Sequence, residues 1–194
     1  KNGLDINNET KICDACSYNL TKKEIDWAAR EKQLIQLLDK HRKTRGYDCI
    51  VPGSGGKDSA YTAHILKYKY DMNPLTVTWA PHMYTDIGWQ NFDNWIKKGG
   101  FDNVLFTPNG KVHELLTSLS FKNLLHPFQP FIIGQKIIGP LFAKKFEIPL
   151  IFYGENQAEY GNAVEENSNP KMDTKFFSTK GKNEIILGGE RLDD

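Results

Sequence analysis

The sequence predicts an α/β protein with a parallel, doubly wound sheet and helices on both faces. Short β-rich runs alternate with segments whose apolar residues recur at helical spacing, a pattern typical of such sheets. A glycine-rich loop also separates the first apolar run from the helical pattern that follows it, as where a parallel strand leads into its crossover helix. With 194 residues, the chain is long enough for one domain with a full core.

The β-rich runs predict four strands, at residues 47–51, 75–79, 103–107 and 148–153. Helical spacing predicts helices at residues 21–41, 60–71, 89–99, 112–119 and 132–142. Parallel strands place their carboxyl ends at one edge of the sheet, near which ligands bind. We therefore expect the functional residues to follow the strands.

The two ends of the chain differ from its middle. Residues 1–20 are polar and contain the C-x-x-C pair Cys13 and Cys16, so they predict a small N-terminal cysteine knuckle ahead of a main domain at 21–194. The polar stretch 161–182 predicts a mobile loop or lid. Because the last residues read as the entry to a helix, we expect the main domain to be incomplete at its C-terminus.

Composition limits the class of protein. The 25 basic and 24 acidic residues give a net charge of +1, which does not indicate a nucleic-acid partner. Three cysteines are too few for a disulfide framework and fit a reducing, cytoplasmic setting. No stretch approaches the roughly 20 apolar residues of a membrane span.

The most informative motif is the loop Pro52-Gly-Ser-Gly-Gly-Lys-Asp-Ser59. Its glycines allow close approach to a ligand, and the helix that follows directs N–H groups and a positive dipole end at the loop, which suits an anion. The loop is not a Walker A motif, because Asp58 stands where a hydroxyl residue must follow the lysine. A dinucleotide-binding loop would need glycine at that same position.

The segment Ser54-Gly55-Gly56-Lys57-Asp58-Ser59 closely resembles the S-G-G-x-D-S signature of the PP-loop ATP pyrophosphatases. The resemblance implies that the loop grips the β- and γ-phosphates of ATP, while the bond between the α- and β-phosphates is cleaved. Lys57 would offset the charge of the leaving group, and Asp58 would position Mg²⁺ or the loop. A structural turn capped by Asp58 is the alternative.

The resemblance also implies that adenine lies against the end of the second predicted strand, near Thr78 and Trp79. A buried core position is an equally good interpretation of Trp79. At the end of the fourth predicted strand, Glu155, Asn156 and Glu159 resemble a G-x-N-x-x-[DE] element of other PP-loop enzymes, which implies contact with magnesium or ammonia. A polar helix cap is the alternative there.

Together, the C-x-x-C pair, the glycine loop and Tyr153-Gly-Glu-Asn-Gln-Ala-Glu159 resemble the N-acetyl sugar amidotransferases over nearly the whole chain. These enzymes act in bacterial lipopolysaccharide O-antigen and pseudaminic acid pathways. The resemblance implies that the acetamido oxygen of a sugar is adenylated by ATP, and that ammonia then displaces AMP to give an acetamidino group. A glutaminase partner is expected to supply the ammonia, since no cysteine stands at a strand-to-helix elbow beside a histidine.

The remaining candidate residues concern metal and substrate. The family carries a second, upstream C-x-x-C, and four thiolates make a closed zinc site; here Cys13 and Cys16 provide half of one, with or without Zn²⁺. His126, Gln135 and Lys136 precede or begin a helix that should border the crevice. They are candidates for contact with the sugar, with a local hydrogen bond or a solvated face as the alternative.

Two other functions fit the same loop. A tRNA-modifying PP-loop enzyme, such as a base thiolase, would use the C-x-x-C in sulfur or iron–sulfur chemistry and would bind its substrate in a strongly salt-dependent way. A non-catalytic adenine-nucleotide-binding module would bind ATP without releasing pyrophosphate. The loop leaves the identity of any acetamido sugar open.

Overall fold

The computed structural model describes residues 11–155, 186–187 and 190–191. The described residues belong to two compact units, one with residues 11–40 and Glu155 and the other with residues 41–154 and the short strands near the end of the chain. The sequence-predicted boundary after residue 20 is not tested by this division and stays a prediction.

The first unit contains two helices, α1 (Asp14–Thr21) and α2 (Trp27–His41), the second of which ends at the unit boundary. The structure differs from the sequence prediction at both. Residues 14–21 are helical although they carry no apolar periodicity. Helix α2 begins at Trp27 instead of Thr21, because the Asp26 carboxylate accepts a hydrogen bond from Ala29 N (3.0 Å) and caps the helix there.

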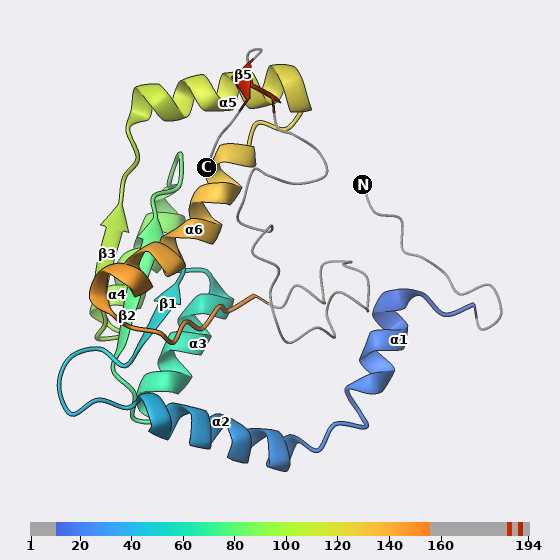
Figure 1. Ribbon diagram of the computed structural model, residues 1–194, viewed down its shortest axis with the longest axis vertical. Helices are drawn as coiled ribbons and strands as arrows, with labels where there is room; N and C mark the ends of the chain where they lie inside the picture. Colours follow the sequence, from blue (N-terminus) through green and yellow to red (C-terminus); the bar gives the residue numbers. More distant parts are fainter. Residues whose placement is uncertain (1–10, 156–185, 188–189, 192–194) are drawn as a thin grey trace. The chain divides into compact units, whose positions relative to one another are not determined.

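The second unit is α/β, with a three-stranded parallel sheet in the order β1 (Cys49–Pro52), β2 (Pro74–Trp79) and β3 (Asp102–Phe106). Figure 1 shows the strands side by side, with helices between them along the chain. The coarse α/β prediction is confirmed. All four residues of β1 are buried, as expected of an inner parallel strand.

The connecting helices are α3 (Lys57–Tyr68), α4 (Asp86–Lys97), α5 (Gly110–Leu124) and α6 (Gln129–Phe146). Side-chain caps begin two of them: Thr85 Oγ1 accepts from Gly88 N at the start of α4, and Asn109 Oδ1 accepts from two backbone N–H groups at the start of α5. A short antiparallel pair, β4 (Ile186–Leu187) with β5 (Glu190–Arg191), completes the described elements, and β4 contacts α5.

The core lies between the sheet and α6. Its buried members are Ile50, Leu75, Val77, Ile138, Phe142 and Ile148. Helix α3 also contacts both β1 and β2, so the strand that leads into the glycine loop is fixed by two helices. This packing gives the loop a rigid base.

The fourth predicted strand, at residues 148–153, is reduced to one parallel bridge between Ile151 and Ile50. Ile50 N donates to Leu150 O (2.9 Å), and Phe152 N donates to Ile50 O (2.8 Å). Since β2 pairs with the other edge of β1, the chain passes from β1 to β2 and β3 and then returns to the opposite side of β1. Strand order therefore reverses beside β1, where α/β proteins commonly bind ligands.

Candidate functional site

The glycine loop begins where β1 ends and is fixed to the neighbouring strand, because Gly53 N donates to Val77 O at 3.0 Å. A Cβ on Gly53 would lie 2.4 Å from Ser59 Cβ and 2.9 Å from the Trp95 ring. Only glycine fits between the strand end, the first turn of α3 and α4. Gly53 therefore lies directly against Ser59 in the first turn of α3.

Gly55 is held in a conformation that favours glycine, with a φ of +86°. A Cβ there would lie 2.7 Å from the backbone of Phe92 on α4. Gly56, by contrast, has open space at its Cβ and an extended backbone (φ −66°, ψ 154°) as the N-cap of α3. No side chain caps α3, so the positive end of the helix dipole lies at the loop and can attract an anion.

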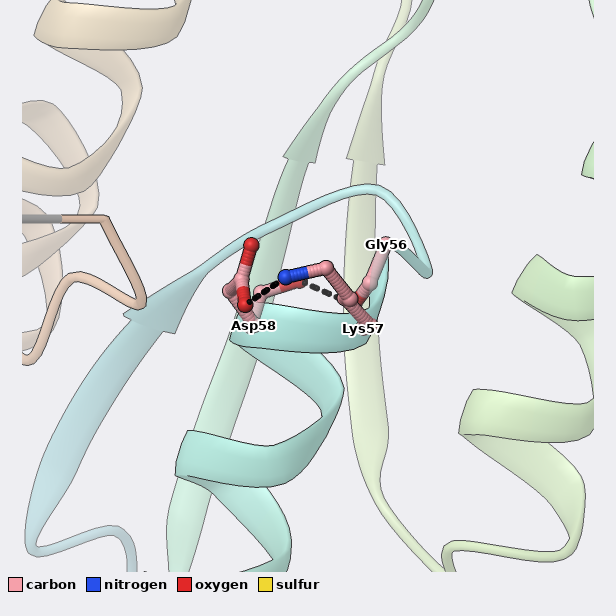
Figure 2. Close-up of polar contacts among 4 residues, drawn as sticks. Gly56, Lys57 and Asp58 are labelled. Atoms are coloured by element: carbon pink, nitrogen blue, oxygen red, sulfur yellow. Dashed lines mark hydrogen bonds and ion pairs between the residues drawn. The ribbon is translucent and has the colours of Figure 1, made fainter. Parts of the chain in front are cut away.

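Figure 2 shows Lys57 and Asp58 at the start of α3, where Lys57 Nζ lies 2.8 Å from Asp58 Oδ1. The Lys57 side chain is 89% exposed, so this ion pair contributes little to stability. Ser59 Oγ donates to Gly56 O at 3.1 Å. An exposed lysine, an exposed carboxylate and a half-buried hydroxyl therefore surround an uncapped helix N-terminus. In this arrangement Lys57 can reach a phosphate and Asp58 a hydrated Mg²⁺.

Gly154 brings the end of the fourth strand segment to the same place. A Cβ on Gly154 would lie 2.5 Å from Ser59 N and 2.6 Å from the Asp58 carbonyl carbon. Gly154, from the second motif at 153–159, thus contacts the backbone of the first turn of α3, which belongs to the glycine-loop motif. Glu155 is exposed and belongs to the other unit. Asn156, Glu159 and the predicted lid at 161–182 lie outside the described residues.

Thr78 and Trp79, predicted beside adenine, are largely enclosed by protein. Thr78 is fully buried, and its Oγ1 accepts from Asn103 Nδ2 at 3.0 Å. The Trp79 ring lies against Gly134 of α6, where a Cβ would come within 2.2 Å of the ring, and is 5.0 Å from the Phe106 ring centroid. A ligand at this strand end would meet the residues after Trp79.

The three predicted substrate residues do not gather at one point. His126 is exposed before α6, and its backbone N–H is 3.4 Å from Ser120 O. Gln135 is exposed and Lys136 half-buried, two turns into α6, which puts them roughly 10 Å beyond its start. Burial lowers the pKa of the Lys136 ammonium. The Lys136 carbonyl accepts from Tyr153 Oη at 3.3 Å, so this part of α6 lies near the end of the fourth strand segment.

The cysteines differ in their surroundings. Cys16 is exposed, and a hydrogen bond with Cys13 raises the pKa of its thiol. The two thiols of the C-x-x-C pair are therefore neighbours. Within the part of the chain that the structure describes, no three histidine, cysteine or acidic side chains form a metal-binding group. Cys49 is buried in β1, and burial raises the pKa of its thiol to about 12.

The sequence prediction missed a cavity of about 400 Å³ at the same carboxyl edge of the sheet. Its lining residues are Ala80, Pro81, His82, Thr107, Pro108, Gly110, His113, Glu114 and Thr117. The first three directly follow β2, and the next two follow β3. The rule that ligands collect beyond strand ends could have indicated these residues, but the two histidines carry no spacing signal of their own.

Similarity to a known protein covers part of the chain. No family model matches the chain. An uncharacterized protein of Methanocaldococcus jannaschii is 38% identical over 74 residues, which is 37% of this chain and 26% of that protein. The match therefore spans about a quarter of the relative's length. Among the described residues, no helix has both the length and the apolar character needed to cross a membrane.

Proposed function

We propose that the chain is an ATP-dependent N-acetyl sugar amidotransferase of the PP-loop type, built on a doubly wound parallel sheet. The observation that carries the proposal is the loop at residues 52–59. It combines the S-G-G-x-D-S sequence at 54–59 with glycines at 53 and 55 that admit no side chain. The loop also leads into an uncapped helix N-terminus beside the reversal of strand order. These features suit the polyphosphate of a nucleotide.

In this function, backbone N–H groups at the start of α3 and the Lys57 ammonium bind the β- and γ-phosphates. The acetamido oxygen attacks the α-phosphorus, the bond to the bridging oxygen breaks, and pyrophosphate leaves with its charge offset by Lys57. Ammonia then adds to the activated carbon, and AMP departs with the former acetamido oxygen after a proton is lost from nitrogen. Mg²⁺, held through Asp58, would neutralise phosphate charge when bound. Glu155, Asn156 and Glu159 are the proposed ammonia-site residues.

The cavity beyond β2 and β3 supports the same function. Parallel strands lie about 4.8 Å apart, so the cavity is roughly 5 to 10 Å across the sheet edge from the glycine loop. A nucleotide whose phosphates occupy the loop can extend its nucleoside along that edge. We therefore propose that the adenosine lies beyond Thr78 and Trp79, in the cavity that begins at Ala80.

The source of nitrogen is external in this proposal. A glutaminase uses an activated cysteine, but the Cys49 thiol is buried with its pKa raised to about 12. Cys13 and Cys16 supply two thiol ligands, half of a structural zinc site, and Zn²⁺ has no part in the proposed reaction. A glutaminase subunit is the proposed partner, the acetamido sugar the substrate, and the cytoplasm the location.

The direct test incubates the chain with ATP, Mg²⁺, ammonium and a panel of diacetamido sugars. The proposal expects AMP, pyrophosphate and a sugar product in which NH replaces one oxygen, formed only when the acceptor is present. ATP binding with no pyrophosphate from any acetamido sugar would support a nucleotide-binding module instead. Strongly salt-dependent tRNA binding with AMP formation would support the tRNA-modifying alternative.

A further inference from the structure

His113, on the first turn of α5, is buried in the wall of the cavity described above. It is 8% exposed, and its Nε2 is inaccessible to water and has no hydrogen-bond partner among the described residues. Buried polar atoms nearly always have a partner, so an unpaired ring nitrogen on a cavity-lining residue offers a position for a hydrogen bond from a bound group.

The hydrogen bonds around His113 bear on whether the bound group donates or accepts a hydrogen bond at Nε2. Thr117 Oγ1 donates its only proton to His113 O at 2.8 Å. Thr117 Oγ1 also lies 3.5 Å from His113 Nδ1, where it can accept a hydrogen bond from a proton held on that nitrogen. Burial and the neighbouring His82 lower the pKa of His113, which favours a neutral ring. In the tautomer with its proton on Nδ1, Nε2 is a hydrogen-bond acceptor that a donor group satisfies.

The cavity also has features suited to a planar ring. The exposed His82 ring lies edge-on to His113, with 4.5 Å between their centroids, and 5.2 Å from the Phe131 ring. His82 stands on the connection between β2 and α4, so its side chain can turn aside. A heteroaromatic ligand that replaced it would keep the aromatic contacts and bring an amino group to Nε2.

We propose that His113 is a specificity-determining residue for the base of the nucleotide, accepting a hydrogen bond from an exocyclic amino group. This rests on the ATP-dependent function proposed above. A 6-amino purine offers the required donor. In the same pose, a 6-oxo purine places an oxygen acceptor against the Nε2 lone pair, which disfavours its binding relative to a 6-amino purine.

The probes are ATP and ITP, whose bases differ at two places: the 6-amino group is replaced by a 6-oxo group, and N1 gains a proton. Binding to the full chain is measured by calorimetry, with Mg²⁺ and without acceptor sugar. Wild type should bind ATP about 10-fold or more tightly than ITP, since a mismatched buried hydrogen bond costs on the order of a factor of ten. His113→Phe, which keeps a ring and removes the acceptor, should bring the two affinities within about 2-fold.

A further variant separates this role from structural damage. His64→Gln, at an exposed position on α3 outside the cavity lining, should behave as wild type. Unchanged discrimination in a folded His113→Phe protein would overturn the inference while leaving the ATP function intact. Equal affinity of the wild-type protein for ATP and ITP would also overturn the role of His113 while leaving the ATP function intact. Binding of neither nucleotide to wild type would overturn both proposals.

Discussion

Gly154 lies against the backbone of Ser59, so that a Cβ at residue 154 would come within 2.5 Å of Ser59 N. This contact joins the end of the fourth strand segment to the first turn of α3, on either side of the point where strand order reverses. Neither backbone can shift without moving the glycine loop. The relation explains why the segment that begins the second motif contains a glycine at this position.

Gly154→Ala should therefore displace the start of α3 and weaken ATP binding. We expect at least a 10-fold loss of affinity by calorimetry, because a misplaced loop no longer directs its N–H groups at the phosphates. Gly100→Ala is the stability control, since its φ of +64° also disfavours alanine while it lies outside both the glycine loop and the residues that line the cavity. If Gly154→Ala binds ATP as wild type does, the contact between the two motifs is not required for the site.

Gly55→Ala tests the backbone conformation of the glycine loop. Its φ of +86° and the nearby Phe92 backbone both disfavour a side chain, so we expect unfolding free energy to fall by about 1–3 kcal/mol in urea denaturation. Gly56→Ala, with an ordinary φ and open space, should cost less, about 1 kcal/mol or below, because only the poorer capping by alanine opposes it. Equal effects of the two substitutions would contradict the described loop conformation.

Thiol labelling tests the cysteine environments. A thiol with a pKa of about 12 is only about one part in ten thousand thiolate at pH 8, and Cys49 is also buried, so it should react with iodoacetamide only after unfolding. The exposed Cys16 should label in the native protein. Mass spectrometry of peptides from native and urea-treated protein distinguishes the sites. Rapid native labelling of Cys49 would show that β1 is not the buried strand described.

Periodicity predicted β1, β2, α3, α4 and α6 because each of them buries apolar residues. It also predicted β3 and α5, although several of their apolar side chains stay exposed. It could not predict that residues 148–153 would form only one bridge. Pro149 has no N–H to donate, and Glu147 takes a left-handed φ of 54° just before this segment. Helix α1 lacks the apolar stripe on which such predictions depend.

The loop could be recognised from sequence because its residues are consecutive. The strand-end rule also points to the residues after β2 and β3, but it does not predict that His82 and His113, 31 residues apart, lie side by side in the cavity wall. Sequence patterns likewise do not predict that the Trp79 ring packs against Gly134 of α6. Contacts that depend on packing between distant elements need the folded chain.

The most direct test of the glycine loop as the catalytic phosphate site compares two exposed lysines. Each belongs to an ion pair of 2.8 Å, Lys57 with Asp58 and Lys97 with Asp93. Pyrophosphate release is measured with ATP, Mg²⁺, ammonium and the best acetamido sugar. Lys57→Ala should lose about 100-fold or more of the rate, as when one group that stabilises developing charge is removed, while Lys97→Ala should match wild type. Full pyrophosphate release by Lys57→Ala would contradict the assignment of the glycine loop as the catalytic phosphate site.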